Sequence, residues 1–262
     1  MKYTFVTSLN NNYWNSTSKI NLQSWCNCLP EDVDIIVYSE DNIDVNKVSH
    51  RLQYKPLYEL CKPLVEFKIK HKDNPHYNGQ IGRKLEGSSK AFKWNGIKFA
   101  HKTFAIFTEA KQQENGYLVW LDADVLMHKF INHEYLNKLF PKNKSISYLG
   151  RPEEYDECGL MGYNLNTEFA RNFLQKFENE YLNGMDHLRE THDSWVFYQL
   201  RLGYEDQSPF LNLNPKPVNN KSPFNNSGIK EVMVHTKGKN KERLQQKFLK
   251  RFMLEERRRQ NA

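Results

Sequence analysis

An unbroken run of strand-forming residues leads into two aspartates near the middle of the 262-residue chain, in the stretch YLVWLDADVL at residues 117–126. Every residue of the run Tyr117–Leu121 is apolar or aromatic, so both faces of the strand that it predicts are apolar. Such strands lie in the middle of parallel sheets, where helices cover both faces. The stretch therefore predicts an α/β fold, with Asp122 and Asp124 at the carboxyl end of a central strand.

The order of the other predicted elements agrees with such a sheet. Residues 3–7 and 33–38 predict strands and residues 18–28 a helix between them, which is a strand–helix–strand opening. Later patterns predict a helix over 88–110 capped by Ser88 and Ser89, a strand over 145–149, helices over 167–181 and 193–202, a strand over 232–235 and a helix over 242–259. The segments 10–12 and 211–228 predict a loop and a connector.

Residues 68–90 have a different composition from their surroundings. They contain three glycines, an Asn-Pro pair and six lysines or arginines, which predicts a mobile, basic loop. A lid over an anionic ligand and a solvated surface excursion are equally consistent with this composition.

Composition limits the partners and the compartment. The net charge of +7 suits anionic ligands such as nucleotide diphosphates and an acidic surface equally well, but it is too diffuse to indicate a nucleic acid, and we expect none as a partner. The first residues lack the apolar core of a signal peptide, and no apolar run approaches the roughly 20 residues of a membrane span. We therefore expect a soluble, cytoplasmic protein. The four cysteines match no zinc pattern and predict free, buried thiols.

The two aspartates raise an electrostatic question. Ligands of parallel sheets bind at the carboxyl ends of the strands, where Asp122 and Asp124 are expected. Positions one apart can point to the same side of a strand, and two carboxylates there repel each other unless a cation joins them. Oxygen ligands of this kind suit Mg²⁺ or Mn²⁺ together with substrate phosphates, and the cation would neutralise a departing diphosphate. The alternative is a surface turn capped by aspartates, which the preceding apolar strand makes less favourable.

Four motifs in the same order carry a family resemblance. They are the DxD of residues 122–124, the strand FVT at 5–7 with the loop after it, the segment ECGLMGYN at 157–164 and the segment VHTKGKNK at 234–241, which matches an HxxGxxK pattern. Together they resemble nucleotide-sugar glycosyltransferases of the GT-A fold, in particular the family 8 group of glycogenin-like and lipopolysaccharide galactosyltransferase-like enzymes. The resemblance implies a Rossmann-like α/β fold with a mixed, mostly parallel central sheet flanked by helices, and a C-terminal amphipathic helix.

The same resemblance implies how the chain is organised and what it does. It implies a single catalytic domain over 1–262, with a nucleotide-binding half at 1–125, a donor-sugar and acceptor half at 126–240 and the C-terminal helix at 241–262. The implied reaction moves a sugar from a nucleoside diphosphate sugar, with UDP as the carrier, to a glycan, lipid or protein acceptor.

Roles for single residues follow from the resemblance as well. Asp122, Asp124 and His235 would hold Mn²⁺ or Mg²⁺, and a neutral imidazole is a good third ligand. The implied nucleotide and donor contacts are Asp122 again, with Thr7, Ser8, Tyr13, Lys102, Ala123, Lys237, Gly238 and Lys241. Gly238 allows a close approach of the backbone, and the lysines supply point charges for phosphate. Taken alone, His235 is an ordinary strand-end histidine, but the DxD upstream favours the ligand interpretation.

Two carboxylates are candidates for catalysis. Asp193 opens a predicted helix, where an aspartate is usually a cap, but similar glycosyltransferases use an acidic residue in this region to orient a sugar or to act as base. Glu157 is the second candidate, with a solvated loop acid as the equally favoured alternative. Lys102 and Tyr13 have ordinary alternatives too, as a solvated helix charge and as a core aromatic residue.

The C-terminal helix has two interpretations. Residues 241–259 contain eight basic and three acidic residues, with apolar positions 244, 248 and 252 at four-residue spacing. A basic amphipathic helix can rest on an anionic membrane, as a peripheral contact. More often the apolar stripe packs on its own domain.

Two further classes of function remain as alternatives. Aspartate-nucleophile phosphohydrolases also carry an apolar strand followed by DxD, and there Asp122 would attack phosphorus while Asp124 acted as acid and base. Their motif usually lies near the N-terminus, whereas here it lies in mid-chain. A non-catalytic, metal-dependent carbohydrate-binding module is less consistent with the strand–helix–strand opening.

Overall fold

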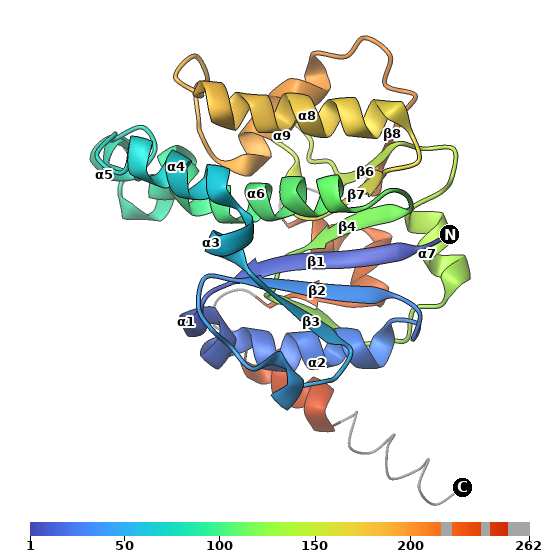
Figure 1. The fold of residues 1–262 in the computed structure, drawn as a ribbon. Coiled ribbons are helices and arrows are strands. Elements are labelled where there is room, and N and C mark those ends of the chain that lie inside the picture. Colours follow the sequence, from blue (N-terminus) through green and yellow to red (C-terminus); the bar gives the residue numbers. More distant parts are fainter. Residues whose placement is uncertain (216–221, 237–241, 251–262) are drawn as a thin grey trace, which may run out of the picture.

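The computed structural model describes residues 1–215, 222–236 and 242–250. A seven-stranded sheet forms its centre, with the strand order β3-β2-β1-β4-β7-β6-β8 (Figure 1). Its strands are β1 (Tyr3–Leu9), β2 (Asp34–Ser39), β3 (Leu52–Pro56), β4 (Tyr117–Leu121), β6 (Ile146–Leu149), β7 (Glu157–Asn164) and β8 (Phe210–Asn212). Two short strands, β5 (Val125–Met127) and β9 (Met233–His235), form a separate antiparallel pair.

Strand directions confirm a mixed, mostly parallel sheet. The β1 strand runs parallel to β2 and β4, β2 runs parallel to β3, and β6 runs parallel to β8. The β7 strand is antiparallel to both β4 and β6. The expectation that β4 lies between parallel neighbours is therefore wrong on one side. Both faces of β4 are buried because helices cover them, whatever the direction of the neighbouring strand. The apolar run alone therefore could not predict that β7 runs antiparallel to β4.

Helical segments connect the strands. The longer α-helices are α2 (Lys19–Cys28), α4 (Lys62–His71), α5 (Gln80–Glu86), α6 (Gly96–Gln112), α7 (His133–Leu139), α8 (Glu168–Asn183) and α9 (Asp193–Leu202). The short ones are α1 (Asn11–Tyr13), α3 (Leu57–Leu60) and α10 (Pro223–Asn226), with a π-helical turn at Trp14–Ser18 and 3₁₀ turns at Val45–Lys47, Ser88–Trp94 and Gly228–Glu231. Most predicted helices and strands are thus present with ends shifted by a few residues.

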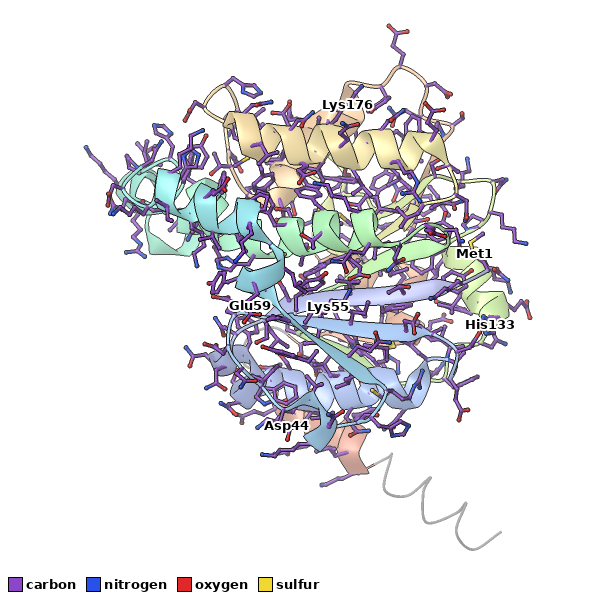
Figure 2. The ribbon with its side chains drawn as sticks, in the orientation of Figure 1. Met1, Asp44, Lys55, Glu59, His133 and Lys176 are labelled. Atoms are coloured by element: carbon purple, nitrogen blue, oxygen red, sulfur yellow. The ribbon has the colours of Figure 1, made fainter. Side chains whose placement is uncertain are left out.

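Two hydrophobic cores lie on opposite faces of the sheet. Side chains of α2 pack into one core, and those of α4, α6 and α8 pack into the other. Successive residues of β4 alternate between them, with Val119 and Leu121 in the first core and Leu118 and Trp120 in the second. Figure 2 shows side chains filling the space between the sheet and the helices. This alternation explains why the run needs apolar residues at every position.

Three predicted segments differ from the structure. Residues 68–90 contain the end of α4 and all of α5, so the prediction of a mobile loop is wrong. Leu64, Phe67 and His71 of α4 are buried at helical spacing, and this amphipathic helix continues into the lysine-rich segment as far as His71. Residues 10–12, predicted as a loop, lead into α1.

The helix predicted from residue 88 begins instead at Gly96. Asn95 caps it, since its side-chain Oδ1 accepts a hydrogen bond from the Lys98 backbone N–H at 3.1 Å. Residues 88–94 form a 3₁₀ turn in front of this cap, so the two serines do not start the helix.

The described part of the C-terminal segment packs on the protein itself. Residues 242–250 are helical, and Phe248 is buried in the same core as α2. The Gln245 amide donates hydrogen bonds to the Thr17 carbonyl and to Asn21 Oδ1. Residues 251–259 of the predicted helix lie outside the described residues. In the described part of the chain no helix has the length and apolar character to cross a membrane. All four cysteines are buried, and none forms a disulfide with another.

Candidate active site

A tight turn and a strand pair position the candidate metal ligands. Asp122 follows the last residue of β4, and its backbone N–H donates to the Gly159 carbonyl of β7 at 2.9 Å. The Val125 N–H then bonds to the Asp122 carbonyl at 2.9 Å, which closes a turn that contains Asp124. The β5 strand leaves this turn and pairs with β9, with His235 opposite Val125. A residue more than a hundred positions downstream is therefore held beside the DxD.

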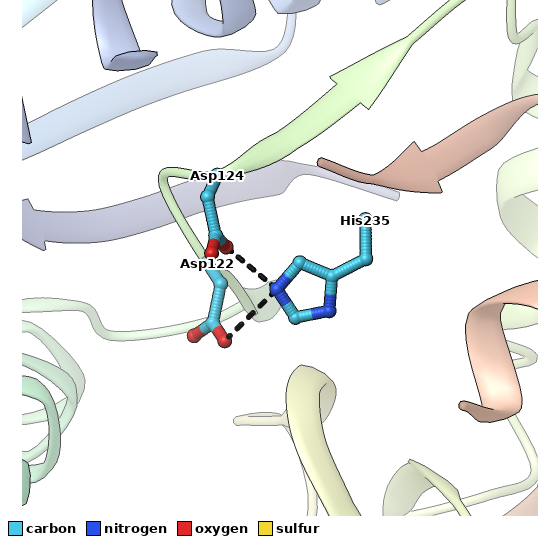
Figure 3. Close-up of side chains that lie close together, drawn as sticks. All are labelled: Asp122, Asp124 and His235. Atoms are coloured by element: carbon cyan, nitrogen blue, oxygen red, sulfur yellow. Dashed lines mark hydrogen bonds and ion pairs between the residues drawn. The ribbon is translucent and has the colours of Figure 1, made fainter. Parts of the chain in front are cut away.

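The three side chains converge on one point (Figure 3). His235 Nε2 lies 2.6 Å from Asp124 Oδ1 and 3.9 Å from Asp122 Oδ2. One ligand atom from each residue can be chosen so that all three lie within 4.8 Å of one another. His235 is buried and the two aspartates are partly exposed, so the group opens towards solvent on the carboxylate side. Two carboxylate oxygens and one imidazole nitrogen are a donor set that fits Mn²⁺ or Mg²⁺.

Neighbouring groups fix the orientation of Asp122. Its Oδ1 accepts hydrogen bonds from Trp120 Nε1 at 2.7 Å and from Lys102 Nζ at 3.1 Å, while Oδ2 faces His235. One oxygen is thus held by the protein and the other is directed at the shared point. Such supporting contacts orient metal ligands in proteins.

His235 is oriented by packing. Its Nδ1 atom is buried and has no hydrogen-bond partner among the described residues. The Phe224 ring packs edge-on against the imidazole, with 5.0 Å between the ring centroids. In many metal sites a hydrogen bond to the second ring nitrogen orients the histidine. Here the strand pairing and this aromatic contact orient the ring instead.

Lys102 is a buried cation beside the pair. It comes from α6, and its Nζ lies 2.8 Å from Asp193 Oδ2 and also donates to Asp122 and to the Cys158 carbonyl. Burial alone would lower the pKa of Lys102, but the carboxylates of Asp122 and Asp193 outweigh it and raise the pKa above its ordinary value. Lys102 therefore stays charged and links the candidate metal ligands to Asp193.

The two candidate catalytic carboxylates are both buried and both paired with a cation. Asp193 is the first residue of α9 and only 2% exposed, and it pairs with Lys102. Glu157 is the first residue of β7 and pairs with Arg151. The interpretation of Glu157 as a solvated loop acid is therefore wrong.

Gly159 allows these groups to come close together. A Cβ atom at this position would lie 2.8 Å from the Phe224 ring and 3.2 Å from both Asp122 Oδ2 and Glu157 Oε1. Any side chain larger than hydrogen would displace the carboxylates or the ring that packs on His235.

A cleft of about 710 Å³ passes in front of these side chains. Eight of the residues predicted from the sequence line it, namely Ser8, Tyr13, Lys102, Asp122, Ala123, Asp124, Glu157 and Asp193. Tyr13 is 45% exposed, and burial, followed by the charges of Asp124 and Asp122, raises the pKa of its phenol. Thr7 is completely buried and does not line the cleft, which argues against a side-chain contact with a donor. Lys237, Gly238 and Lys241 lie outside the described residues.

Several residues of the site were not found from the sequence. Asn21 of α2 is completely buried, and its amide donates to the Ala123 carbonyl at 3.0 Å and to Thr236 Oγ1 at 3.3 Å. Thr236 in turn donates to the Asp124 carbonyl from both its N–H and its hydroxyl. Asn21 therefore ties α2 to the DxD turn and to the residue after β9. An amide on the apolar side of the predicted helix was its only signal in the sequence.

Comparisons with known proteins bear on the fold. The sequence matches no protein-family model, and no curated protein matches it significantly. The fold is similar to that of mouse xyloside xylosyltransferase 1 in its apo form, with a TM-score of 0.50 and 13% identity over 82% of this chain and 86% of that chain. This likeness confirms the predicted α/β fold of the GT-A type.

Weaker structural similarities also occur. The glycosyltransferase GlyE of Streptococcus pneumoniae TIGR4 has a TM-score of 0.47 and 13% identity, and the match covers 81% of this chain and 45% of that one. A glycosyltransferase involved in glycosylation of the major capsid of PBCV-1 has a TM-score of 0.43 and 12% identity, over 93% of this chain and 98% of that one.

Proposed function

We propose that this protein is a metal-dependent glycosyltransferase that moves a sugar from a nucleoside diphosphate sugar, with UDP as the carrier, to a hydroxyl group of an acceptor. The observation that carries the proposal is the convergence of Asp122, Asp124 and His235, of which the two aspartates line a cleft, in a fold shared with a xylosyltransferase structure. A saccharide, a lipid or a protein can carry the acceptor hydroxyl. The resemblance to the family 8 group in the sequence motifs supports the same activity.

The cation would be held by Asp122, Asp124 and His235. When bound, it would neutralise charge on the diphosphate as that group leaves. Lys102 adds a second, permanent positive charge beside Asp122. Lys237, Gly238 and Lys241 remain predicted contacts of the diphosphate, through point charges and close backbone approach.

Asp193 and Glu157 are the proposed catalytic residues. In the transfer, the bond from the anomeric carbon to the diphosphate oxygen breaks with its electron pair on the diphosphate. The acceptor oxygen forms the new bond to that carbon, and its proton passes to a basic oxygen. Lys102 and Arg151 pair with Asp193 and Glu157 respectively. Such charged carboxylates can accept hydrogen bonds from sugar hydroxyls and stabilise the positive charge that develops at the anomeric carbon.

The nucleoside would occupy the part of the cleft next to β1. Ser8, Tyr13 and Ala123 line it there, and Tyr13 presents an exposed ring on which a base can stack. The proposed organisation keeps one catalytic domain over 1–262, with nucleotide-binding residues in 1–125, donor-sugar and acceptor residues in 126–240 and a C-terminal helix in 241–262.

A screen for donor turnover tests the proposal. The protein is incubated with Mn²⁺ and a panel of nucleoside diphosphate sugars, and released nucleoside diphosphate is measured with and without simple glycoside acceptors. We expect slow release without acceptor that disappears with chelator and in the Asp124→Asn variant. The matched control is Asp34→Asn, because Asp34 lies on the surface at the start of β2. Release of phosphate from generic phosphomonoesters, without turnover of any nucleotide sugar, would instead indicate the phosphohydrolase.

A further inference from the structure

The cleft has an aromatic end that neither the metal site nor the nucleoside contacts explain. Phe92, Phe99 and Tyr155 all line the cleft and are partly exposed to it. Their rings surround the buried imidazole of His192, with centroid distances of 5.4, 5.8 and 4.5 Å respectively. We call the three rings the aromatic wall. Partly exposed rings that share one cleft are typical of a ligand-binding surface.

The aromatic wall is connected to the candidate metal ligands by a chain of contacts. Lys102 joins Asp122 to Asp193, at 3.1 Å and 2.8 Å. His192, at the centre of the wall, immediately precedes Asp193, and Phe99 lies three residues before Lys102 on the same face of α6. The wall is therefore joined to the metal ligands through the Lys102–Asp193 pair. If the donor diphosphate sits on the metal and its sugar lies at Asp193 and Glu157, the acceptor would lie beyond that sugar, at the wall.

His192 is a fixed support for the wall. Its Nε2 is 2.9 Å from Glu190 Oε2, and its Nδ1 accepts a hydrogen bond from the Trp195 N–H at 3.4 Å. Both ring nitrogens are thus engaged within the protein, and the imidazole is 1% exposed. The three rings line the cleft, where Lys98 Nζ lies over the Phe99 ring at 5.8 Å and the Arg151 guanidinium over the Tyr155 ring at 5.3 Å from the ring centroids. Asn95 and Glu157 are polar groups in the same cleft.

We propose that the aromatic wall is the acceptor subsite and that it binds the C–H face of a pyranose ring. This inference rests on the proposed glycosyltransferase function and narrows its acceptor to a saccharide. The C–H groups on one face of a pyranose carry partial positive charge and pack on the negative face of an aromatic ring. The hydroxyl groups at the edge of the sugar need hydrogen-bond partners, and the polar residues of the cleft supply them. A flexible alkyl chain would gain apolar burial from the rings but has no hydroxyl groups to form hydrogen bonds with the polar side chains of the cleft.

Conservative variants separate stacking from folding. Phe99→Leu and Phe92→Leu keep apolar volume but remove the flat aromatic face. Phe130→Leu is the matched control, because Phe130 is 67% exposed and does not line the cleft. Thermal melting of each variant establishes that it is folded. The probes are methyl β-pyranosides of xylose, glucose and galactose, added to the protein with Mn²⁺ and UDP.

Saturation-transfer NMR measures pyranoside binding directly, and UDP affinity is measured on the same samples. We expect at least one pyranoside to receive saturation at its ring C–H protons, and Phe99→Leu to weaken its binding by about fivefold, as expected for loss of one aromatic contact. Phe130→Leu should leave pyranoside affinity unchanged, and no variant should change UDP affinity. In turnover assays Phe99→Leu should raise the KM for the acceptor and leave the donor KM and acceptor-free hydrolysis unchanged.

Three results would overturn the acceptor subsite. They are no saturation transfer to any pyranoside in the unmodified protein, unchanged pyranoside affinity in Phe99→Leu, and a loss of UDP affinity in Phe99→Leu, which would place the nucleobase on the wall. These results are distinct from failure of the proposed function, which would appear as no nucleotide-sugar turnover by the unmodified protein.

Discussion

Lys102 places a permanent positive charge between the two halves of the candidate site. Its ammonium contacts a candidate metal ligand, Asp122, and a candidate catalytic residue, Asp193. A buried ion pair contributes little net stability while both partners are present, but removing one partner leaves the other as an uncompensated buried charge. Lys102 therefore both links the two parts of the site and stabilises the fold by pairing with Asp193.

Replacing Lys102 tests this coupling. We expect Lys102→Met to lower the free energy of unfolding by about 3 kcal/mol, because Asp193 would stay buried without its cation. Urea denaturation measures the change. Lys98→Met, four residues earlier on the same helix but exposed, should change it by less than about 0.5 kcal/mol.

A double variant identifies the cause. Adding Asp193→Asn to Lys102→Met should restore part of the lost stability, because the amide carries no charge. A double variant less stable than Lys102→Met would show that lost packing, and not the unpaired carboxylate, is responsible.

Gly159 gives a second test at the scale of one residue. Gly159→Ala would place a methyl group against Phe224, Asp122 and Glu157, so we expect a tenfold or greater loss of Mn²⁺ affinity, on the order of 1.4 kcal/mol or more. The matched control is Gly228→Ala, where an added Cβ meets nothing within 4 Å. Isothermal titration with Mn²⁺ measures both. Equal affinity in the two variants would show that the close approach at Gly159 does not matter.

Single residues of the site were predictable to different degrees. Asp122 and Asp124 were predictable because two carboxylates directly after a fully apolar strand repel each other unless a cation lies between them. His235 could be predicted as a metal ligand only from the motif in which it lies. Asn21 and Gly159 act through contacts between distant segments, and nothing local in the sequence distinguishes a supporting amide or glycine from an ordinary one. Trp120 acts on Asp122 two residues later, but in the sequence it was only one of the apolar residues of the strand.

Among the elements, the β5–β9 pair depends on α2 for its position. The Asn21 side chain bonds both to the DxD turn and to Thr236, and it also accepts a hydrogen bond from Gln245 of the helical segment 242–250. The β5–β9 pair and the helical segment 242–250 thus meet at one buried amide of α2. Such networks cost free energy when they are only partly satisfied.

Asn21→Leu removes this amide at nearly constant volume. We expect a loss of about 2 kcal/mol in the free energy of unfolding, because the Ala123 carbonyl and the Gln245 amide lose a buried partner. Weaker Mn²⁺ binding should accompany it, because the DxD turn and β9 are no longer tied together. Gln23→Leu on the same helix is the control, since its amide donates to Asn27 one turn later and has no other hydrogen-bond partner within residues 1–215, 222–236 and 242–250. Unchanged Mn²⁺ affinity in Asn21→Leu would show that the strand pairing alone positions the ligands.

Elements were easiest to predict where hydrophobic periodicity was strong. β1, β2, β4 and α8 follow directly from their apolar patterns. The β7 strand was not recognised as a strand, because Gly159 and Gly162 lower its apparent strand propensity. Its reversed direction follows from pairing with β4, which a local pattern does not encode. α4 and α5 were obscured by glycine and lysine, although the buried positions of α4, namely Leu64, Phe67 and His71, keep helical spacing.

The stability of the whole molecule depends on pH, because burial favours the neutral form of titratable side chains such as His71. His71 of α4 stacks on Tyr77 with 4.0 Å between ring centroids, in the core that covers one face of the sheet. Burial lowers the pKa of His71 below its ordinary value of 6.5. The folded protein therefore binds fewer protons at this ring than the unfolded chain when the pH lies between the two pKa values.

This shift predicts a direction for acid sensitivity. The stability linked to His71 is complete above pH 6.5 and is lost as the pH falls through the lower pKa of the folded state, at up to about 1.4 kcal/mol per pH unit. His71→Leu should be less sensitive to pH below 6.5 than the unmodified protein. Urea denaturation at a series of pH values measures this, and parallel curves for the two proteins would contradict it.

The α/β class of the whole molecule was predictable because the strand–helix–strand opening and the apolar run of β4 are typical of such folds, whereas the strand order was not predicted. The place where β9 returns to the DxD was not predictable from physics alone, since it depends on a connection over a hundred residues. The sequence motif pointed to it, and the fold brings the residues together.

Pulsed electron paramagnetic resonance of the Mn²⁺ complex with UDP tests whether one cation is held by the DxD and by His235 while it binds the diphosphate. We expect couplings from a histidine nitrogen and from phosphorus in the same complex, with the nitrogen coupling lost in His235→Ala and the phosphorus coupling retained. A phosphorus coupling without a nitrogen coupling in the unmodified protein, or a nitrogen coupling that persists in His235→Ala, would contradict the account.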